Sequence, residues 1–217
     1  MMTSTRPDLT VSVSLLSQFM SNPSSQHWES GKKVIRYLKG TSNLALCFKP
    51  LKDIDTSDVI TAFSDSDWAK DPSDRKSYSG YAVYIGDCLI SWKCKKQTAV
   101  ALSTAEAEYM ALALVTTEVV WLRNLLEEIG FPQSKPTTIF CDNKSAIHMA
   151  TNDVIGPKTK HISIKHHFLR DMIANDFITL QYIPSAENVA DFMTKPLLGQ
   201  KFLKFRNQLK MINMNEL

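Results

Sequence analysis

The chain has 217 residues, which suffices for one full domain with an appendage, and its 44% hydrophobic and 22% charged residues are ordinary for a soluble globular protein. The net charge of +3 is too small to establish a nucleic-acid partner by itself, because many enzymes carry as much. The four cysteines form no CxxC pair, which argues against a structural zinc site or a secreted disulfide framework and favours a reducing compartment.

The N-terminal part of the chain predicts two helices and no targeting segment. Charged residues and a proline at 6–8 interrupt the start of the chain, so we expect no signal peptide, and no apolar run approaches the length needed to cross a membrane. We therefore expect an intracellular, cytoplasmic protein. Apolar residues at helical spacing predict one helix near 8–20 and a second near 24–40.

From residue 59 onward the pattern changes to strands and helices in alternation. Strands are expected at 59–64, 80–85, 88–93, 138–141 and 178–183, and Gly86 in the turn of the second and third should take a positive φ. Helices are expected at 103–128, 143–151, 166–174, 187–194 and 200–211. Three strands, a helix, and then strand and helix in turn predict an α/β fold whose mixed sheet has helices on both faces.

Four acidic residues occupy different local settings along this pattern: Asp65, Glu106, Asp142 and Asp191. Two of them end a β-branched or aromatic run, and two lie at or near a helix start. Carboxylates brought together in this way repel one another unless a cation lies between them, and hard oxygen ligands suit Mg²⁺ or Mn²⁺. Two such ions can clamp the attacking and leaving oxygens of a phosphodiester. The set therefore indicates a nuclease.

Three of these carboxylates also have a purely structural interpretation. Asp65 is the first polar residue on the strand face that Phe63 helps define, and alone it is equally a turn aspartate. Asp142 suits an N-cap, although it also lies at a strand end, where open α/β sheets bind ligands. Asp191 can also be interpreted as a solvent-exposed residue of a short helix. No single carboxylate is decisive, and their joint order carries the interpretation.

The helix start STAEAEYMAL offers two glutamates. Glu106 fits a capping box with Ser103, and this segment alone favours that structural role. Glu108 lies about 200° further round the helix, at the head of a bulky stripe that leaves little room for a hydrated ion. The small Ala113 leaves more space beside Glu106. The local pattern tilts only slightly towards Glu106 as a metal ligand.

Several motifs occur in a characteristic order: FSDSDWA, DRKSYSGYAVYIG, ISWKCKKQTAVALSTAEAEYMAL, WLRNLL, IFCDNKSAI, KTKHISIKHHFLRD and IPSAENVADFMTKPL. Together they closely resemble the ribonuclease H domain of copia-type retrotransposon Pol polyproteins. The segment before them resembles the end of reverse transcriptase and its connection to that domain. The resemblance implies a helical segment at 1–50, a ribonuclease H-like domain at 58–198 and a C-terminal helix or tail at 199–217.

The resemblance also implies a fold, a reaction and a ligand set. The sheet should have five strands, the first three antiparallel and the next two parallel to the first. The reaction should be hydrolysis of the RNA strand of an RNA–DNA hybrid with two Mg²⁺ ions, or with Mn²⁺, held by Asp65, Glu106, Asp142 and Asp191. An Ala-Leu pair typically follows the catalytic glutamate by two helical turns, and counting back from residues 113–114 gives Glu106. Glu108 stays open as the ligand in its place.

Contacts to the hybrid should come mainly from the phosphates and the 2′-hydroxyls rather than from base reading. The candidate contact residues are Arg75, Lys76, Lys96, Asn143, Ser145, Lys160 and His161. Asn143 and Ser145 are favoured, because free N–H groups at a helix start attract anions. Many family members have a histidine before the last aspartate; the loop 184–189 has none, and His161 is a candidate substitute.

Two other functions are alternatives to a ribonuclease H. A non-catalytic retrotransposon remnant, kept as a nucleic-acid- or protein-binding module, predicts the loss of a metal ligand, yet all four are present. An integrase of the same fold lacks a ligand at the start of the helix after the third strand. The expected partners are therefore an RNA–DNA hybrid and the reverse-transcriptase portion of the same polyprotein, with no membrane partner.

Overall fold

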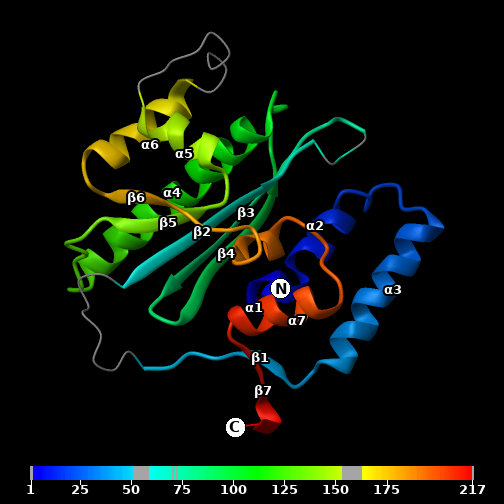
Figure 1. Ribbon diagram of the computed structural model, residues 1–217. Coiled ribbons are helices and arrows are strands. Elements are labelled where there is room, and N and C mark those ends of the chain that lie inside the picture. Colours follow the sequence, from blue (N-terminus) through cyan, green and yellow to red (C-terminus); the bar gives the residue numbers. More distant parts are fainter. Residues whose placement is uncertain (1, 51–58, 70, 72, 153–162, 217) are drawn as a thin grey trace.

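A five-stranded mixed sheet forms the centre of the computed structural model, which describes residues 2–50, 59–69, 71, 73–152 and 163–216 (Figure 1). The strands are β2 (Ile60–Asp67), β3 (Tyr78–Ile85), β4 (Cys88–Lys96), β5 (Thr137–Cys141) and β6 (Ile178–Tyr182), in the spatial order β4-β3-β2-β5-β6. β2, β3 and β4 are antiparallel neighbours, β5 runs parallel to β2, and β6 runs parallel to β5. The predicted α/β sheet and its strand directions are confirmed.

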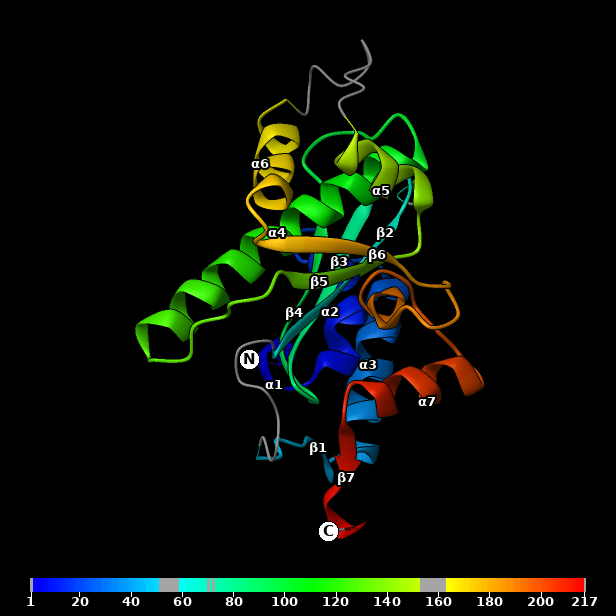
Figure 2. The same ribbon diagram turned by 60° about the vertical axis from the view of Figure 1, so that its left-hand side comes forward.

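Three helices cover one face of the sheet: α4 (Thr104–Glu128), α5 (Lys144–Thr151) and α6 (Ser163–Ala174) (Figures 1 and 2). α4 is the central one, and it buries the stripe Leu112, Val115 and Val119 against the strands. Ser103 caps its start by accepting a hydrogen bond from the N–H of Glu106. The main core of the protein therefore lies between α4 and the sheet.

The length and composition of α4 alone would allow it to cross a membrane, which corrects the expectation that no apolar run approaches this length. In the fold, 56% of the 18-residue apolar stretch of α4 is buried inside the protein. The core between α4 and the sheet accounts for this apolar character, since a helix packed on a sheet needs a wide hydrophobic face.

Elements from both ends of the chain cover the opposite face: α1 (Met2–Thr5), η1 (Pro7–Leu9), α2 (Thr10–Ser17), η3 (Val189–Met193) and α7 (Gly199–Gln208). Tyr84 and Leu89 of the sheet form a second core with Phe192, Phe205 and Leu209. The predicted segments 1–50 and 199–217 thus pack on the sheet of the predicted domain 58–198.

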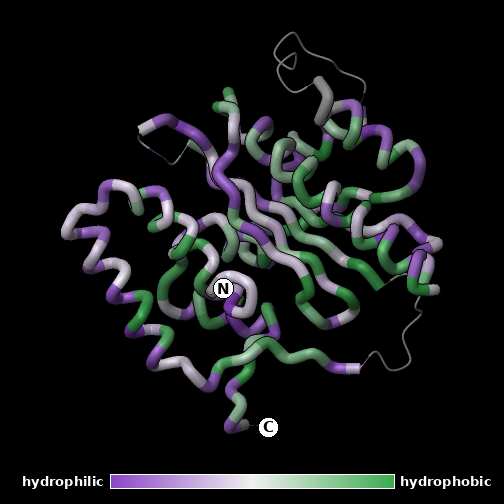
Figure 3. The backbone as a smooth tube through the Cα atoms, turned by 180° about the vertical axis from the view of Figure 1, so that it is seen from behind, coloured by the Kyte–Doolittle hydropathy of each residue, from purple (hydrophilic) through white to green (hydrophobic). Residues whose placement is uncertain are grey.

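α3 (Ser25–Gly40) lies at the edge of the molecule, where hydrophilic and hydrophobic residues alternate along it and none is buried (Figure 3). Its start is capped by Ser24, whose hydroxyl accepts a hydrogen bond from the N–H of His27.

A second, two-stranded sheet was not predicted. β1 (Leu44–Leu46) pairs antiparallel with β7 (Met211–Asn213), and a short 3-10 helix, η4 (Met214–Glu216), follows. The expectation of one helix over 200–211 is wrong at its end, because α7 stops at Gln208 and Lys210 takes a φ of 58°. That left-handed residue turns the chain so that Met211 begins a strand.

One close approach fixes η3 against the sheet. A Cβ atom on Gly80 of β3 would lie 2.6 Å from Cγ2 of Thr194 and 2.7 Å from Cβ of Met193. Glycine is therefore required for η3 to reach this depth. Gly80 is also the cross-strand partner of Asp65, so the contact lies beside a predicted site residue. At the far end of β3, Gly86 has the expected positive φ, 55°.

Candidate active site

Asp65 lies near the end of β2 and is only 1% exposed. Its carboxylate accepts a hydrogen bond from the hydroxyl of Thr194, and Nζ of Lys195 lies 3.5 Å from Oδ2. Both partners follow η3 directly in the chain. The close packing of η3 on Gly80 therefore places a hydroxyl and an ammonium group against the central carboxylate of the site.

Asp191, in η3, is also 1% exposed and is held by two lysines. Nζ of Lys195 lies 2.6 Å from Oδ1, and Nζ of Lys201 lies 2.5 Å from Oδ2. Asn188 caps η3 and donates from Nδ2 to the carbonyl oxygen of Ser64, 2.9 Å away on β2. This link joins the segment carrying Asp191 to the strand carrying Asp65.

The two glutamates of α4 make contacts with different parts of the chain. Glu106 is a helix cap: one of its oxygens accepts a hydrogen bond from the N–H of Leu102, 2.6 Å away. Glu108, 5% exposed, accepts a hydrogen bond from the N–H of Ser66 on β2, 3.0 Å away. The structure thus brings Glu108, and not Glu106, to the strand that carries Asp65. These contacts favour Glu108, the alternative left open above, over the predicted Glu106 as the helix ligand.

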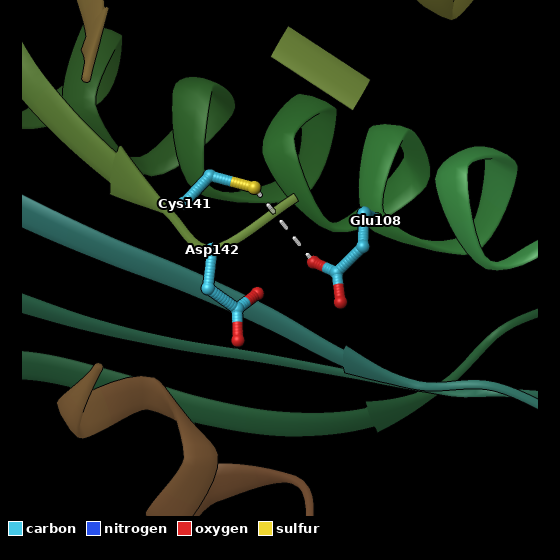
Figure 4. Close-up of side chains that lie close together, drawn as sticks. All are labelled: Glu108, Cys141 and Asp142. Carbon is cyan, nitrogen blue, oxygen red and sulfur yellow. Dashed lines mark hydrogen bonds between the residues drawn. The ribbon is translucent and has the colours of Figure 1, made fainter. Parts of the chain in front are cut away.

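Asp142 completes the carboxylate group. It follows β5, is half-buried, and faces Glu108 across a short gap, with Cys141 beside them (Figure 4). Among the described residues, Glu108, Cys141 and Asp142 have ligand atoms that all lie within 4.8 Å of one another. The hydroxyl of Ser185, from the loop after β6, donates to Oδ2 of Asp142. Asp65 of β2, Glu108 of α4, Asp142 after β5 and Asp191 of η3 therefore meet near the carboxyl ends of β2 and β5.

The pKa shifts reflect this crowding. Burial raises the pKa of Asp65 above its ordinary value; Lys195 opposes the shift, and Asp191 and Asp142 add to it. Burial likewise raises the pKa of Glu108, and the charges of Asp65 and Asp142 raise it further. Burial alone would lower the pKa of Lys195, but Asp65 and Asp191 outweigh it and raise this pKa. Mutual repulsion thus raises the pKa values of the carboxyl groups, and Lys195 offsets only part of this repulsion.

The donor set fits a hard divalent cation. Asp65, Glu108, Asp142 and Asp191 offer carboxylate oxygens, which Mg²⁺ and Mn²⁺ prefer. Cys141 is a poor ligand for such ions, because burial raises the pKa of its thiol and keeps the sulfur protonated. Its sulfur instead lies 4.0 Å from Oε2 of Glu108 as a weak hydrogen-bond partner.

Sequence reasoning did not identify Asn188, Thr194, Lys195 and Lys201 as site residues. The first three flank Asp191 in the quoted motif NVADFMTK, so their nearness in sequence was a usable signal. Lys201 belongs to α7, and only the folded packing of that helix brings it to Asp191.

Three predicted basic contacts, Arg75 and Lys76 in the loop after β2 and Lys96 at the end of β4, differ in their availability for a phosphate. Arg75 is exposed and has a φ of 56°, and Nζ of Lys76 lies 3.9 Å from the carboxylate of Asp74. Lys96 is already engaged, with Nζ 2.5 Å from Asp71 and 3.1 Å from Asp74. The hydrogen bond from Lys96 lowers the pKa of Asp71 to about 2. Arg75 is therefore the more available of these three for a phosphate.

The candidates near Asp142 lie at the start of α5. Asn143 is its N-cap, with Oδ1 accepting a hydrogen bond from the N–H of Ala146, 3.0 Å away, and Ser145 is exposed in the first turn. Lys160 and His161 lie outside the described residues.

The comparisons with known proteins bear on these observations. No family model matches the chain. The retrovirus-related Pol polyprotein from transposon RE2 of Arabidopsis thaliana is 37% identical over 97% of this chain, which spans 14% of that polyprotein. The secreted RxLR effector protein 161 of Plasmopara viticola is 45% identical over 56% of this chain and 83% of its own length. Among solved structures, LC11-RNase H1, isolated from compost, gives a TM-score of 0.47 at 15% identity, covering 63% of this chain and 93% of that one.

Proposed function

Because this chain belongs to the retrovirus-related Pol polyproteins of copia-type transposons, we propose that it is their ribonuclease H part and hydrolyses the RNA strand of RNA–DNA hybrids. The observation that carries the proposal is that Asp65, Glu108, Asp142 and Asp191 converge near the carboxyl ends of β2 and β5. A structural core does not account for four carboxylates brought together from four elements, since each adds repulsion.

These four carboxylates would hold the cation or cation pair that the reaction needs. We propose that Asp65, Asp191, Glu108 and Asp142 would all serve as ligands of this cation or cation pair. Mg²⁺ or Mn²⁺, when bound in such a site, supplies a Lewis acid and an activated water for phosphodiester hydrolysis.

The protein's own contribution is to hold the carboxylates in place before substrate arrives. Thr194 donates to Asp65, the N–H of Ser66 donates to Glu108, and Ser185 donates to Asp142. Each of these bonds engages one oxygen of its carboxyl group, so it restrains the group and leaves the other oxygen available to a cation.

Substrate contacts are proposed at the start of α5, directly after Asp142. Ser145 and the first-turn N–H groups there suit a phosphate of the hybrid, while Asn143 shapes the turn by capping it. Selectivity for RNA is proposed to come from 2′-hydroxyl contacts across the wide minor groove. The reverse-transcriptase portion of the same polyprotein is the second proposed partner, because the relatives are Pol polyproteins.

The test is cleavage of an end-labelled RNA–DNA hybrid by the purified chain with Mg²⁺ or Mn²⁺, with RNA duplex and DNA duplex of the same sequence as controls. We expect cuts in the RNA strand of the hybrid only, and their loss in Asp65→Asn. Hybrid binding without cleavage in either metal would instead support the alternative of a non-catalytic binding module kept from a retrotransposon.

A further inference from the structure

Two lysines occupy both oxygens of Asp191. Lys195, four residues along the chain, contacts Oδ1 and also reaches Asp65, whereas Lys201 comes from α7 and contacts Oδ2 alone. Asp191 is almost fully buried, so each of these contacts is partly shielded from water. A cation that binds Asp191 needs an oxygen that a lysine now holds.

We propose that Lys195 and Lys201 are built-in counter-ions of the metal site, and that an incoming divalent cation displaces Lys201 from Asp191 while Lys195 stays. The inference rests on the proposed metal site of the ribonuclease. It assigns to α7 a role in setting how tightly the ion is held.

The contacts decide which lysine leaves. Lys195 touches two carboxylates and its side chain is 33% exposed. Lys201 touches one carboxylate and is 44% exposed, with Nζ 5.5 Å from the centre of the Phe205 ring. A single, partly exposed ion pair is the weaker one, because solvent screens it and its side chain gains freedom on release. Lys201 therefore yields its oxygen at the lower cost.

A divalent cation that replaces one ammonium group raises the positive charge around the four carboxylates. The exchange is favourable only because the cluster carries more negative charge than two lysines can balance. The pair with Lys201 stabilises the metal-free protein alone, so it must weaken ion binding by the same free energy. Removing the Lys201 charge should thus destabilise the metal-free protein and tighten ion binding together.

The experiment compares Lys201→Met with Lys204→Met in the full chain. Lys204 lies on the same helix and near the same Phe205 ring, but its Nζ donates to the carbonyl oxygen of Ala186, 2.7 Å away. Mn²⁺ and Mg²⁺ binding is measured by calorimetry, and melting temperatures are measured in EDTA and at saturating metal. Lys201→Arg, which keeps the charge, should restore the wild-type affinity.

For Lys201→Met we expect a dissociation constant about fivefold lower than in the wild type. Its melting temperature should fall by about 3 °C in EDTA and stay unchanged at saturating metal. Lys204→Met should match the wild type in all of these measurements. For Lys195→Met we expect a lower melting temperature in both conditions, because Lys195 remains in the loaded site.

Unchanged or weaker ion binding in Lys201→Met would overturn the inference, as would an equal loss of melting temperature with and without metal. A wild-type chain that binds neither ion would overturn it together with the metal site. Tighter binding in Lys201→Met beside a wild type that cleaves no hybrid would support the counter-ion role and refute only the proposed nuclease activity.

Discussion

At the scale of single residues, the site depends on the different directions of the two glutamates in the first turns of α4. Glu108 stands at the head of the stripe Leu112, Val115 and Val119, which packs on the sheet. A side chain at the head of that stripe reaches the C-terminal end of β2, where Glu108 contacts Ser66. Glu106 points back to the helix start and satisfies the N–H of Leu102.

We expect Glu108→Gln to lower hybrid cleavage at least about 100-fold, because the amide lacks the charge that a hard cation needs. Glu106→Gln should keep most of the activity and lose less than about 1 kcal/mol of stability, since glutamine also serves in a helix cap. Cleavage rates and urea melts of both variants check this. An active Glu108→Gln beside an inactive Glu106→Gln would return the ligand role to Glu106.

The raised pKa of Glu108 makes the stability of the metal-free protein depend on pH. A carboxyl group with a higher pKa in the folded state binds more protons there than in the unfolded chain. Its contribution is complete below the ordinary pKa of about 4.3 and is lost as the pH rises through the folded value. The melting temperature in EDTA should therefore fall between about pH 5 and about pH 8.

Glu108→Gln provides the control for this pH dependence. The variant has no carboxyl group to ionise, so its melting temperature in EDTA should fall less over the same range and exceed the wild-type value at the higher pH. Parallel curves for the two proteins would show that Glu108 is not the group responsible.

Three of the four converging carboxylates were predictable from the sequence, whereas for the fourth the sequence favoured Glu106 and left Glu108 open. Asp65 and Asp142 come at the ends of runs that predict strands, and Asp191 lies within a short motif. These are local features that a sequence pattern records. The choice between Glu106 and Glu108 depends on how α4 is rotated on the sheet, a tertiary property. The bulk of the stripe indicates little room for an ion beside Glu108, yet a buried stripe also directs its first residue to the sheet.

At the scale of elements, the position of η3 depends on the absence of a side chain at Gly80. Gly80→Ala would place a methyl group within 2.7 Å of Met193 and closer still to Thr194. We expect a loss of about 1–3 kcal/mol in the free energy of unfolding, as for other overpacked sites. Cleavage should fall as well, because Thr194 and Asp191 move with η3. Chemical denaturation and the cleavage assay measure the two effects.

Gly31→Ala is the matched control for this substitution. Gly31 lies in α3, and beyond its chain neighbours and the backbone of its own helix no atom of the described residues lies within 4 Å of a Cβ built there. Alanine should leave the activity unchanged and raise stability by up to about 1 kcal/mol, through its higher helix propensity. Equal stability losses in both variants would show that crowding at Gly80 is not the cause.

The hairpin of β3 and β4 was predictable, because Gly86 marks a turn between two alternating runs. β1 and β7 were not, since each has three residues and its partner lies at the other end of the chain. Strands this short give no periodicity for a sequence pattern to register.

At the scale of the whole molecule, a buried ion pair anchors the N-terminal helices. Arg6 and Asp8 lie 2.8 Å apart with side chains 9% and 0% exposed, and the hydroxyl of Tyr37 donates to Asp8 at 2.7 Å. Arg6 also donates to the carbonyl oxygen of Thr41, 3.1 Å away. The pair therefore joins η1 to the last turn of α3 and to the C-cap residue Thr41.

Asp8→Ala should cost about 3–5 kcal/mol, because it leaves the Arg6 charge buried without its partner. We expect one unfolding transition at a lower temperature, since α2 packs on β4 and the second core is shared between the chain ends and the sheet. Far- and near-ultraviolet circular dichroism should give coincident curves. Two separate transitions would show that the N-terminal helices unfold independently of the sheet.

The ladder between β1 and β7 has a consequence for the order of folding. Leu44 pairs with Asn213, so this contact closes a loop that contains the whole central sheet. Contacts of such long sequence separation form slowly, because the chain must lose its freedom before the contact stabilises it. During synthesis, Tyr84 and Leu89 stay uncovered by Phe205 and Leu209 until those residues emerge from the ribosome. The nascent sheet therefore has an apolar face that requires protection from misassembly at this stage.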